Sequence, residues 1–240
     1  MDIECNKIKL FYLFNFNIDR KKKIMFVGNF DTGKTSIFSR IYNNSYDENV
    51  EATIGIDFVS KNIRFREQNI KIELWDSCGL EKYKGLIPSY IRNSLLVFVV
   101  YDISYKESFN KVQGWIDFVK SVGNPTIVLC GNKSDLPRRE VEEKEGWEMA
   151  EKEGIKFFEC SAKTNDNIQY MFYSSIAELN IFEINEEINK ENLIKELMEE
   201  NGCEEDQEKI NDNLVFQKKE LTYINIKGIS PKNKKRRFRC

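Results

Sequence analysis

The feature that most constrains the fold is an eight-residue loop, Gly28–Thr35, which follows the apolar run Ile24–Val27 and precedes a helical pattern. Its two glycines let the backbone bend so that N–H groups turn inward on a polyphosphate, and the next helix adds the positive end of its dipole. In this pattern Lys34 reaches the β- and γ-phosphates, and Thr35 binds Mg²⁺. The sequence therefore predicts a phosphate-binding strand–loop–helix unit, with contacts from Gly28, Asp31, Thr32, Gly33, Lys34, Thr35 and Ser36.

Composition removes several classes of function. The chain has 240 residues, 41% of them hydrophobic, which is enough for one well-buried core. Its formal net charge of −2 gives no global field that would attract nucleic acid. Because the chain has no histidine, catalytic triads, metal sites and pH switches based on histidine are excluded. The six cysteines form no Cys-x-x-Cys pair, which is typical of a reduced, cytosolic chain.

Continuous apolar runs alternate with helical periodicity, which indicates a mostly parallel sheet buried on both faces. The apolar runs lie at 23–28, 95–101, 126–130 and 155–158, and the helical patterns near 34–43, 81–93, 108–119, 140–153 and 167–179. Two further strand-like runs, 57–67 and 69–76, predict a hairpin with one antiparallel edge strand. We therefore expect a three-layer α/β fold of the P-loop NTPase type, with six strands and helices on both faces. Its ligand should lie beyond the carboxyl ends of the strands.

The strand at 71–75 ends in an Asp-x-x-Gly sequence, Asp76–Gly79. Asp76 can hold the metal, usually through water, and Gly79 lets its own N–H approach a γ-phosphate without a Cβ clash. An aspartate in a turn followed by glycine is common, so this signal gains its weight from the loop at 28–35.

Two later strands end in the sequences Gly131–Asp135 and Cys160–Lys163. A carboxylate at Asp135 can accept hydrogen bonds from N1 and the 2-amino group of guanine, whereas adenine offers no such pair. This contact would select GTP over ATP. The other expected roles are bracing of the loop by Asn132, stacking of the Lys133 and Lys163 stems on the purine, and donation from the Ala162 N–H to O6, with Ser161 in the same loop. The alternative is a pair of ordinary polar loops, but signals at four strand ends favour a guanine-nucleotide site.

In this order and spacing, the four loops resemble those of the Ras-like small GTPases, over about residues 23–180. Within that family, Ala52–Phe58 and Leu86–Arg92 resemble Rab proteins, closest to the Golgi-associated Rab-six branch. The resemblance implies that Thr53 caps the Mg²⁺ and the γ-phosphate, and that Tyr46 stacks on guanine. It also implies an effector face made of Ile54, Phe58, Trp75 and Tyr90, for whose three aromatic residues ordinary core packing is the alternative.

The same resemblance implies the cofactors and partners. They are GTP or GDP with Mg²⁺, together with effectors, an exchange factor and an activating protein of the Rab type. We expect a monomer that regulates vesicle traffic.

Two departures from the family pattern concern catalysis, for which Lys34, Gly79 and position 80 are the candidate residues. Where Rab proteins carry the glutamine that orients attacking water, this chain has Leu80, which can neither donate to the γ-phosphate nor accept from water. Phe30 stands where the family has a small or modestly polar residue. We therefore predict a slow GTPase that depends on an activating protein. The alternative is a GTP-locked effector-binding module, and a third class, an ATP-dependent P-loop kinase, is disfavoured by Asp135 and by the lack of an obvious lid insertion.

Outside the GTPase domain at 23–180, we expect an N-terminal extension (1–22) and a hypervariable, largely disordered tail (181–240). The apolar stretch at 8–18 is too short and interrupted to span a membrane and precedes no cleavage site, so an extension or an added edge strand is expected. Residues 183–208 are strongly acidic, although apolar residues between Ile184 and Met198 leave a transient or partner-bound helix open.

The last ten residues are basic and end in Cys240. By the resemblance Cys240 is prenylated, and one lipid together with a basic patch is enough for stable anchoring. A nuclear-import patch is the alternative. We thus expect the cytoplasmic face of Golgi or other endomembranes, with cycling to the cytosol.

Overall fold

The computed structural model describes residues 22–79, 87–179, 181–182 and 189–203. All of them belong to the first of two compact units, Met1–Cys203. The strands are β1 (Lys22–Gly28), β2 (Ile56–Phe65), β3 (Gln68–Ser77), β4 (Ser94–Asp102), β5 (Thr126–Asn132) and β6 (Lys156–Glu159). The helices are α2 (Lys34–Asn43), α3 (Ile87–Ile91), α4 (Lys106–Asn110), α5 (Val112–Val122), α6 (Glu143–Glu153), α7 (Ile168–Ile176) and α8 (Lys190–Glu200).

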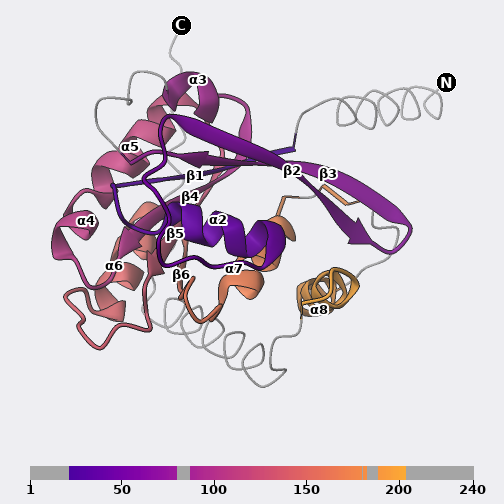
Figure 1. Ribbon diagram of the computed structural model, residues 1–240. Coiled ribbons are helices and arrows are strands. Elements are labelled where there is room, and N and C mark those ends of the chain that lie inside the picture. Colours follow the sequence, from indigo (N-terminus) through magenta and orange to yellow (C-terminus); the bar gives the residue numbers. More distant parts are fainter. Residues whose placement is uncertain (1–21, 80–86, 180, 183–188, 204–240) are drawn as a thin grey trace, which may run out of the picture. The chain divides into compact units, whose positions relative to one another are not determined.

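The six strands form one sheet in the order β2-β3-β1-β4-β5-β6 (Figure 1). All neighbouring strands run parallel except β2 and β3, which form an antiparallel hairpin. The predicted fold class is therefore confirmed. Because β1 is followed in sequence by strands on one side of it and then by strands on the other, the loop after β1 lies at the point where the strand order reverses. Ligands of such sheets bind in the crevice at this point.

Alternating side chains of the central strands pack into two hydrophobic layers, one on each face of the sheet. Met25 and Val27 of β1 belong to a buried cluster with residues of α3, α4, α5 and α6. The intervening residue Phe26 points to the other face, where its ring stacks on Phe98 at 5.1 Å and meets the edge of Phe38 of α2 at 6.4 Å. Helices thus cover both faces of the sheet, as three layers require.

Two predicted helices differ from the structure. The helical pattern at 108–119 is divided into α4 and α5, which meet at Lys111. The helix expected near 81–93 is helical at Ile87–Ile91, while residues 80–86 lie outside the described part of the chain. In the described part of the chain, no helix combines the length and apolar character needed to cross a membrane.

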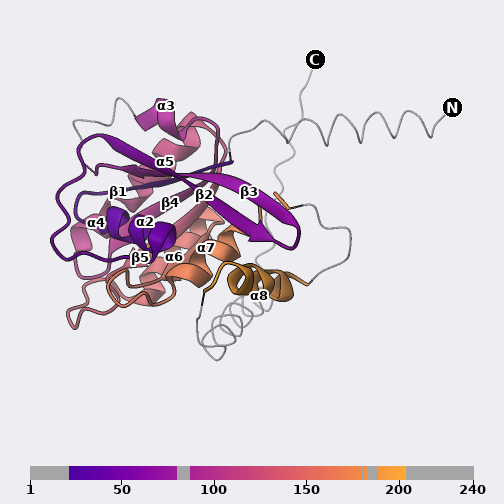
Figure 2. The same ribbon diagram turned by 45° about the vertical axis from the view of Figure 1, so that its right-hand side comes forward.

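Helix α8 lies in the segment where the sequence leaves a transient or partner-bound helix open within a largely disordered tail. Asn189 caps it by accepting from the Glu191 N–H at 3.0 Å, and it packs against β2 and α7 (Figure 2). The acidic composition of this segment suggests disorder, because a count of charged residues ignores which side of a helix each of them occupies. Its acidic side chains leave one apolar stripe buried, which consists of Leu193, Ile194, Leu197 and Met198.

Candidate functional site

The loop after β1 is shaped by its two glycines. Gly28 has φ +142°, and a Cβ there would lie 2.1 Å from the Val100 carbonyl oxygen. Gly33 has φ +82°, and a Cβ there would lie 2.2 Å from the side-chain nitrogen of Asn132. A positive φ and a close neighbour coincide at both positions, so only glycine fits without displacement.

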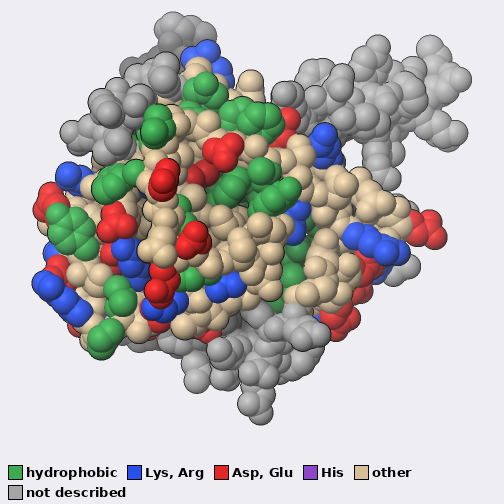
Figure 3. Space-filling view, viewed as in Figure 1, with side chains coloured by type: hydrophobic (Ala, Val, Ile, Leu, Met, Phe, Trp, Pro, Cys, Tyr) green, Lys and Arg blue, Asp and Glu red, His purple; other side chains and the backbone are tan. Residues whose placement is uncertain are grey.

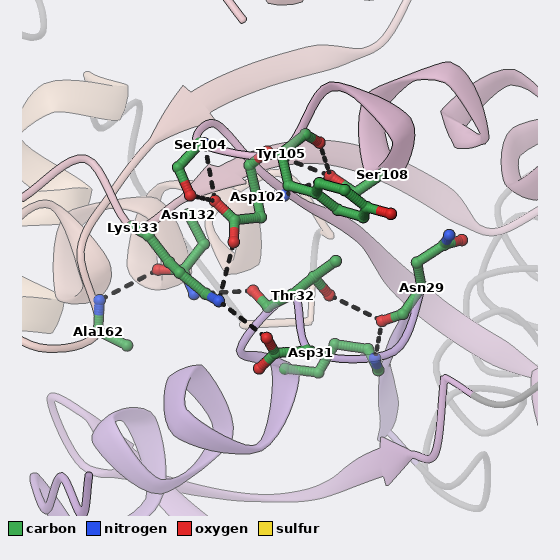
Figure 4. Close-up of polar contacts among 11 residues, drawn as sticks. Asn29, Asp31, Thr32, Asp102, Ser104, Tyr105, Ser108, Asn132, Lys133 and Ala162 are labelled. Atoms are coloured by element: carbon green, nitrogen blue, oxygen red, sulfur yellow. Dashed lines mark hydrogen bonds and ion pairs between the residues drawn. The ribbon is translucent and has the colours of Figure 1, made fainter. Parts of the chain in front are cut away.

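Lys34 begins α2 and lies buried beneath this loop. Its Nζ donates to the Asn29 carbonyl at 2.5 Å. The Thr32 hydroxyl donates to the same oxygen at 3.0 Å (Figure 4). Burial lowers the pKa of the Lys34 ammonium to about 8, although the Asp76 carboxylate raises it. A buried cation of this kind is poised for an anionic ligand, whose charge would offset the cost of desolvation.

Three oxygen ligands predicted for a metal meet beside Lys34. The hydroxyl of Thr35 donates to Asp76 Oδ2 at 2.6 Å and lies 2.7 Å from the hydroxyl of Thr53, which is 3.2 Å from the same Oδ2. The second carboxylate oxygen, Asp76 Oδ1, is buried and has no hydrogen-bond partner among the residues that the structure describes. Burial raises the pKa of the Asp76 carboxyl above its usual value, while the Thr35 hydrogen bond and the Lys34 charge lower it.

This donor set fits Mg²⁺. All its donors are oxygens, which hard divalent cations prefer, and the orphaned buried Oδ1 is an acceptor that a cation or its water would satisfy. Gly79 closes the same region, because a Cβ there would lie 2.2 Å from the Phe30 nitrogen and 2.3 Å from the Asn29 carbonyl carbon. Phe30 itself is 52% exposed. Leu80 lies outside the described residues.

Asn132, at the end of β5, joins two of the predicted loops. Its side-chain nitrogen donates to the Thr32 carbonyl at 2.9 Å, and its Oδ1 accepts from the Ala162 N–H at 3.1 Å (Figure 4). The Ala162 N–H, which we expected to meet guanine O6, thus has a partner within the protein here. The result is a rigid connection between the phosphate loop and the loop after β6.

The predicted base-binding residues line one pocket. Asp135 Oδ1 accepts from the Ser161 hydroxyl at 2.5 Å, and this pair connects the loops after β5 and β6. The residues lining the pocket are Gly33, Ser36, Tyr46, Asn132, Lys133, Asp135, Leu136, Ala162 and Lys163. All the residues proposed to contact the purine except Ser161 therefore face one space next to the phosphate loop.

The structure gives four residues of this region contacts that no sequence motif predicts. Asp102, at the end of β4, pairs with Lys133 Nζ at 2.8 Å, and the more exposed Asp31 lies 3.6 Å from the same nitrogen (Figure 4). Glu48 pairs with Lys163 at 2.5 Å. Arg40, in the last turn of α2, donates to the Ala162 and Lys163 carbonyls. The sequence offers one signal for Asp102, which is its position at a strand end two residues before a serine. In the structure, the N–H and the hydroxyl of this Ser104 both donate to the Asp102 carboxylate.

Three of the predicted effector-face residues, Phe58, Trp75 and Tyr90, contact one another on the hairpin and α3, while Ile54 lies in the segment before β2. The Phe58 and Trp75 rings face each other across β2 and β3 and stack at 4.6 Å, and Trp75 meets Tyr90 at 5.5 Å. Phe58 is 52% exposed and Ile54 is 87% exposed. Figure 3 shows hydrophobic side chains gathered near the hairpin on this side of the molecule. Exposure of this degree argues against ordinary core packing for Phe58.

Cys240 and the basic end of the chain lie outside the described residues, as does the N-terminal extension up to residue 21.

Comparison with known protein families gives one match that bears on this site: the family model described as the Ras family covers residues 23–181, which includes every loop described above.

Proposed function

Since the chain belongs to the Ras family of small GTPases, whose members are GTP/GDP switches, we propose that it is a Rab-type regulator of vesicle traffic with slow intrinsic hydrolysis. The observation that best supports a nucleotide site is the convergence of Thr35, Thr53 and Asp76 beside the buried Lys34. The stack of the half-exposed Phe58 on the partly buried Trp75, which also meets Tyr90, supports the Rab assignment, because it offers an aromatic surface to an effector.

In the proposed site, backbone N–H groups of the loop at 28–35 and the Lys34 ammonium would bind the phosphates. Thr35, Thr53 and Asp76 would hold Mg²⁺, which would supply charge neutralisation on the phosphate oxygens. Asp135 would accept hydrogen bonds from the guanine edge, while the side chain of Asn132 connects the loop after β6 to the phosphate loop. Lys133, Lys163 and Tyr46 would pack on the purine, and Gly79 would bring its N–H to the γ-phosphate.

Slow hydrolysis follows from the residue next to Gly79. A leucine at position 80 has no polar atom to orient water, and Phe30 is exposed beside the place where Gly79 meets the loop. The test is single-turnover hydrolysis of bound GTP by the wild type and by Leu80→Gln, with Phe30→Ala in both backgrounds. We expect Leu80→Gln to raise the rate by about tenfold or more. Equal rates in the two proteins would show that the missing glutamine is not limiting.

A GTP-locked effector-binding module is the second candidate, and Leu80 is the observation that favours it. The nucleotide that stays bound to freshly purified protein separates the two proposals. GDP would support a switch that completes its cycle, and GTP would support the locked module.

Membrane attachment is proposed to occur through a prenyl group on Cys240, assisted by the basic residues before it, at Golgi or other endomembranes. An intact-mass measurement on membrane-derived protein should show the added lipid. A Cys240→Ser protein that remains on membranes would refute the role of this cysteine.

A further inference from the structure

Arg40 connects three separate walls of the base pocket through one side chain. Its Nε donates to the Ala162 carbonyl at 2.7 Å and its Nη2 to the Lys163 carbonyl at 2.8 Å. Its Nη1 donates to the Asn44 carbonyl at 2.9 Å, and its guanidinium carbon lies 5.5 Å from the centre of the Tyr46 ring. The planar guanidinium suits this task, because its donors point in fixed and divergent directions.

Each contacted segment contributes to the pocket. Arg40 itself belongs to α2, the helix that begins with Lys34 and Thr35 beneath the phosphate loop. The segment that starts at Asn44 carries Tyr46, and the loop after β6 carries Ala162 and Lys163. The main chain of Arg40 is also held, because its carbonyl accepts from Gln169 Nε2 of α7 at 3.2 Å.

The loop that Arg40 holds in turn positions the residues expected to read the base. The Ala162 N–H donates to Asn132 Oδ1 at 3.1 Å, and the Ser161 hydroxyl donates to Asp135 Oδ1 at 2.5 Å. A displacement of residues 161–163 would therefore move hydrogen-bond partners of both Asn132 and Asp135. The Asp135 carboxylate could then no longer meet the 2-amino and N1 hydrogens of guanine in one fixed orientation.

We propose that Arg40 is a positioning residue that sets guanine discrimination and the residence time of the nucleotide through the loop at 161–163. This inference rests on the proposed function, because it takes the pocket to be the guanine site. It assigns Arg40 no contact with the reacting phosphate.

The test measures the dissociation rates of GDP and of inosine diphosphate, which lacks the 2-amino group, from the wild type and from Arg40→Gln. In the wild type we expect GDP to dissociate about tenfold more slowly than inosine diphosphate, because one charge-assisted hydrogen bond is lost with the amino group. In Arg40→Gln we expect GDP to dissociate about tenfold faster than from the wild type, with the ratio of the two rates falling toward one. Arg40→Lys, which keeps the charge without the fork, should give an intermediate ratio.

Arg66→Gln is the matched control. Arg66 also lies against an aromatic ring, that of Phe65 at 5.2 Å, and it donates to the Glu196 carboxylate. It lies in the turn between β2 and β3 and is not among the residues that line the base pocket. Its loss should leave the ratio at the wild-type value. A faster release of both nucleotides from Arg40→Gln with an unchanged ratio would mean a general loss of structure, and it would overturn the inference, as would unchanged rates. A wild type that fails to distinguish the two nucleotides would instead overturn the proposed guanine site and this inference with it.

Discussion

The two ends of the nucleotide site are held together in different ways. At the base end, polar groups pair within the protein: Asp135 with Ser161, Lys163 with Glu48, and Asn132 with both Thr32 and Ala162. At the phosphate end, a buried ammonium has a backbone carbonyl as its acceptor, and Asp76 Oδ1 is buried without a partner among the described residues. The base end is thus organised by the fold, whereas the phosphate end is organised for a charged ligand and a cation that complete it.

The largest effect is expected from Lys34→Met, which keeps the apolar stem and removes the charge. Nucleotide affinity should fall by about 100-fold or more, because a buried ammonium facing phosphate has no substitute. The melting temperature of the nucleotide-free protein should be unchanged or higher, because the cost of burying the cation disappears. Affinity measured by nucleotide titration and thermal unfolding without nucleotide give the two readouts. A large loss of stability in the free protein would mean that Lys34 is needed for the fold as well as for the ligand.

Asp76→Asn should remove the response to the metal while preserving the shape of the side chain. In the wild type, chelation of Mg²⁺ should speed GDP release by about tenfold or more, because a cation held by Thr35, Thr53 and Asp76 would neutralise charge on the phosphates. In Asp76→Asn, chelation should change the rate by no more than about twofold, since the carboxylate proposed to hold the cation is gone. The measurement is GDP dissociation with and without a chelator. An undiminished response in the variant would place the metal on other ligands.

A smaller effect is expected at the base end from Ser161→Ala. This change removes the hydroxyl that fixes Asp135 but leaves the carboxylate itself. Because one hydrogen bond contributes about 1 kcal/mol, the preference for GDP over inosine diphosphate should fall by about fivefold. Competition binding of the two nucleotides measures this preference. Gln113→Ala serves as a control, because Gln113 makes side-chain hydrogen bonds to Asp117 and Glu153, away from the pocket. A Ser161→Ala protein with the wild-type preference would show that Asp135 is oriented by other contacts.

The contrast between the two ends also explains what the sequence could predict. Short motifs at strand ends locate the loops at 28–35, 76–79, 132–135 and 161–163, because parallel strands bring their carboxyl ends to one edge. Arg40, Glu48 and Asp102 belong to no such motif. Their roles depend on which carbonyl or side chain lies opposite in three dimensions, and Arg40 reaches partners more than a hundred positions away. No local pattern encodes such a contact.

For a different reason, the sequence leaves helix α8 open only as a transient or partner-bound helix. Its apolar residues have helical spacing, but the many acidic residues around them make the segment polar as a whole, and a polar, acidic composition favours disorder. The structure shows that the stripe of Leu193, Ile194, Leu197 and Met198 is buried and that the charged face also makes specific contacts. Glu196 pairs with Arg66 at 3.1 Å, and Asn201 donates to the Arg64 carbonyl at 2.8 Å while accepting from the Arg64 N–H at 3.1 Å. Composition alone cannot detect an arrangement that depends on which side of the helix each residue occupies.

The smallest effect on the nucleotide is expected from Leu197→Ala in α8, which tests whether the two ends of the site are independent of this helix. Leu197 is fully buried, so its truncation should lower the free energy of unfolding by about 2–4 kcal/mol, through lost burial and the cavity left behind. Helix α8 contacts Arg64 of β2 and Arg66 in the turn after it, at the far end of the strand from Ile56, which is the end nearest Thr53. Helix α8 also packs on α7, whose Gln169 donates to the Arg40 carbonyl at the base end. We expect neither route to transmit the cavity at Leu197, so GDP dissociation should change by no more than about twofold. Chemical denaturation and GDP dissociation, measured on the same preparation, separate the two effects, with Glu199→Ala on the exposed side of α8 as the control. A marked acceleration of GDP release in Leu197→Ala alone would mean that the hairpin, or α7 through the Gln169–Arg40 hydrogen bond, transmits the state of α8 to the nucleotide site, and that this site depends on the protein far beyond its own loops.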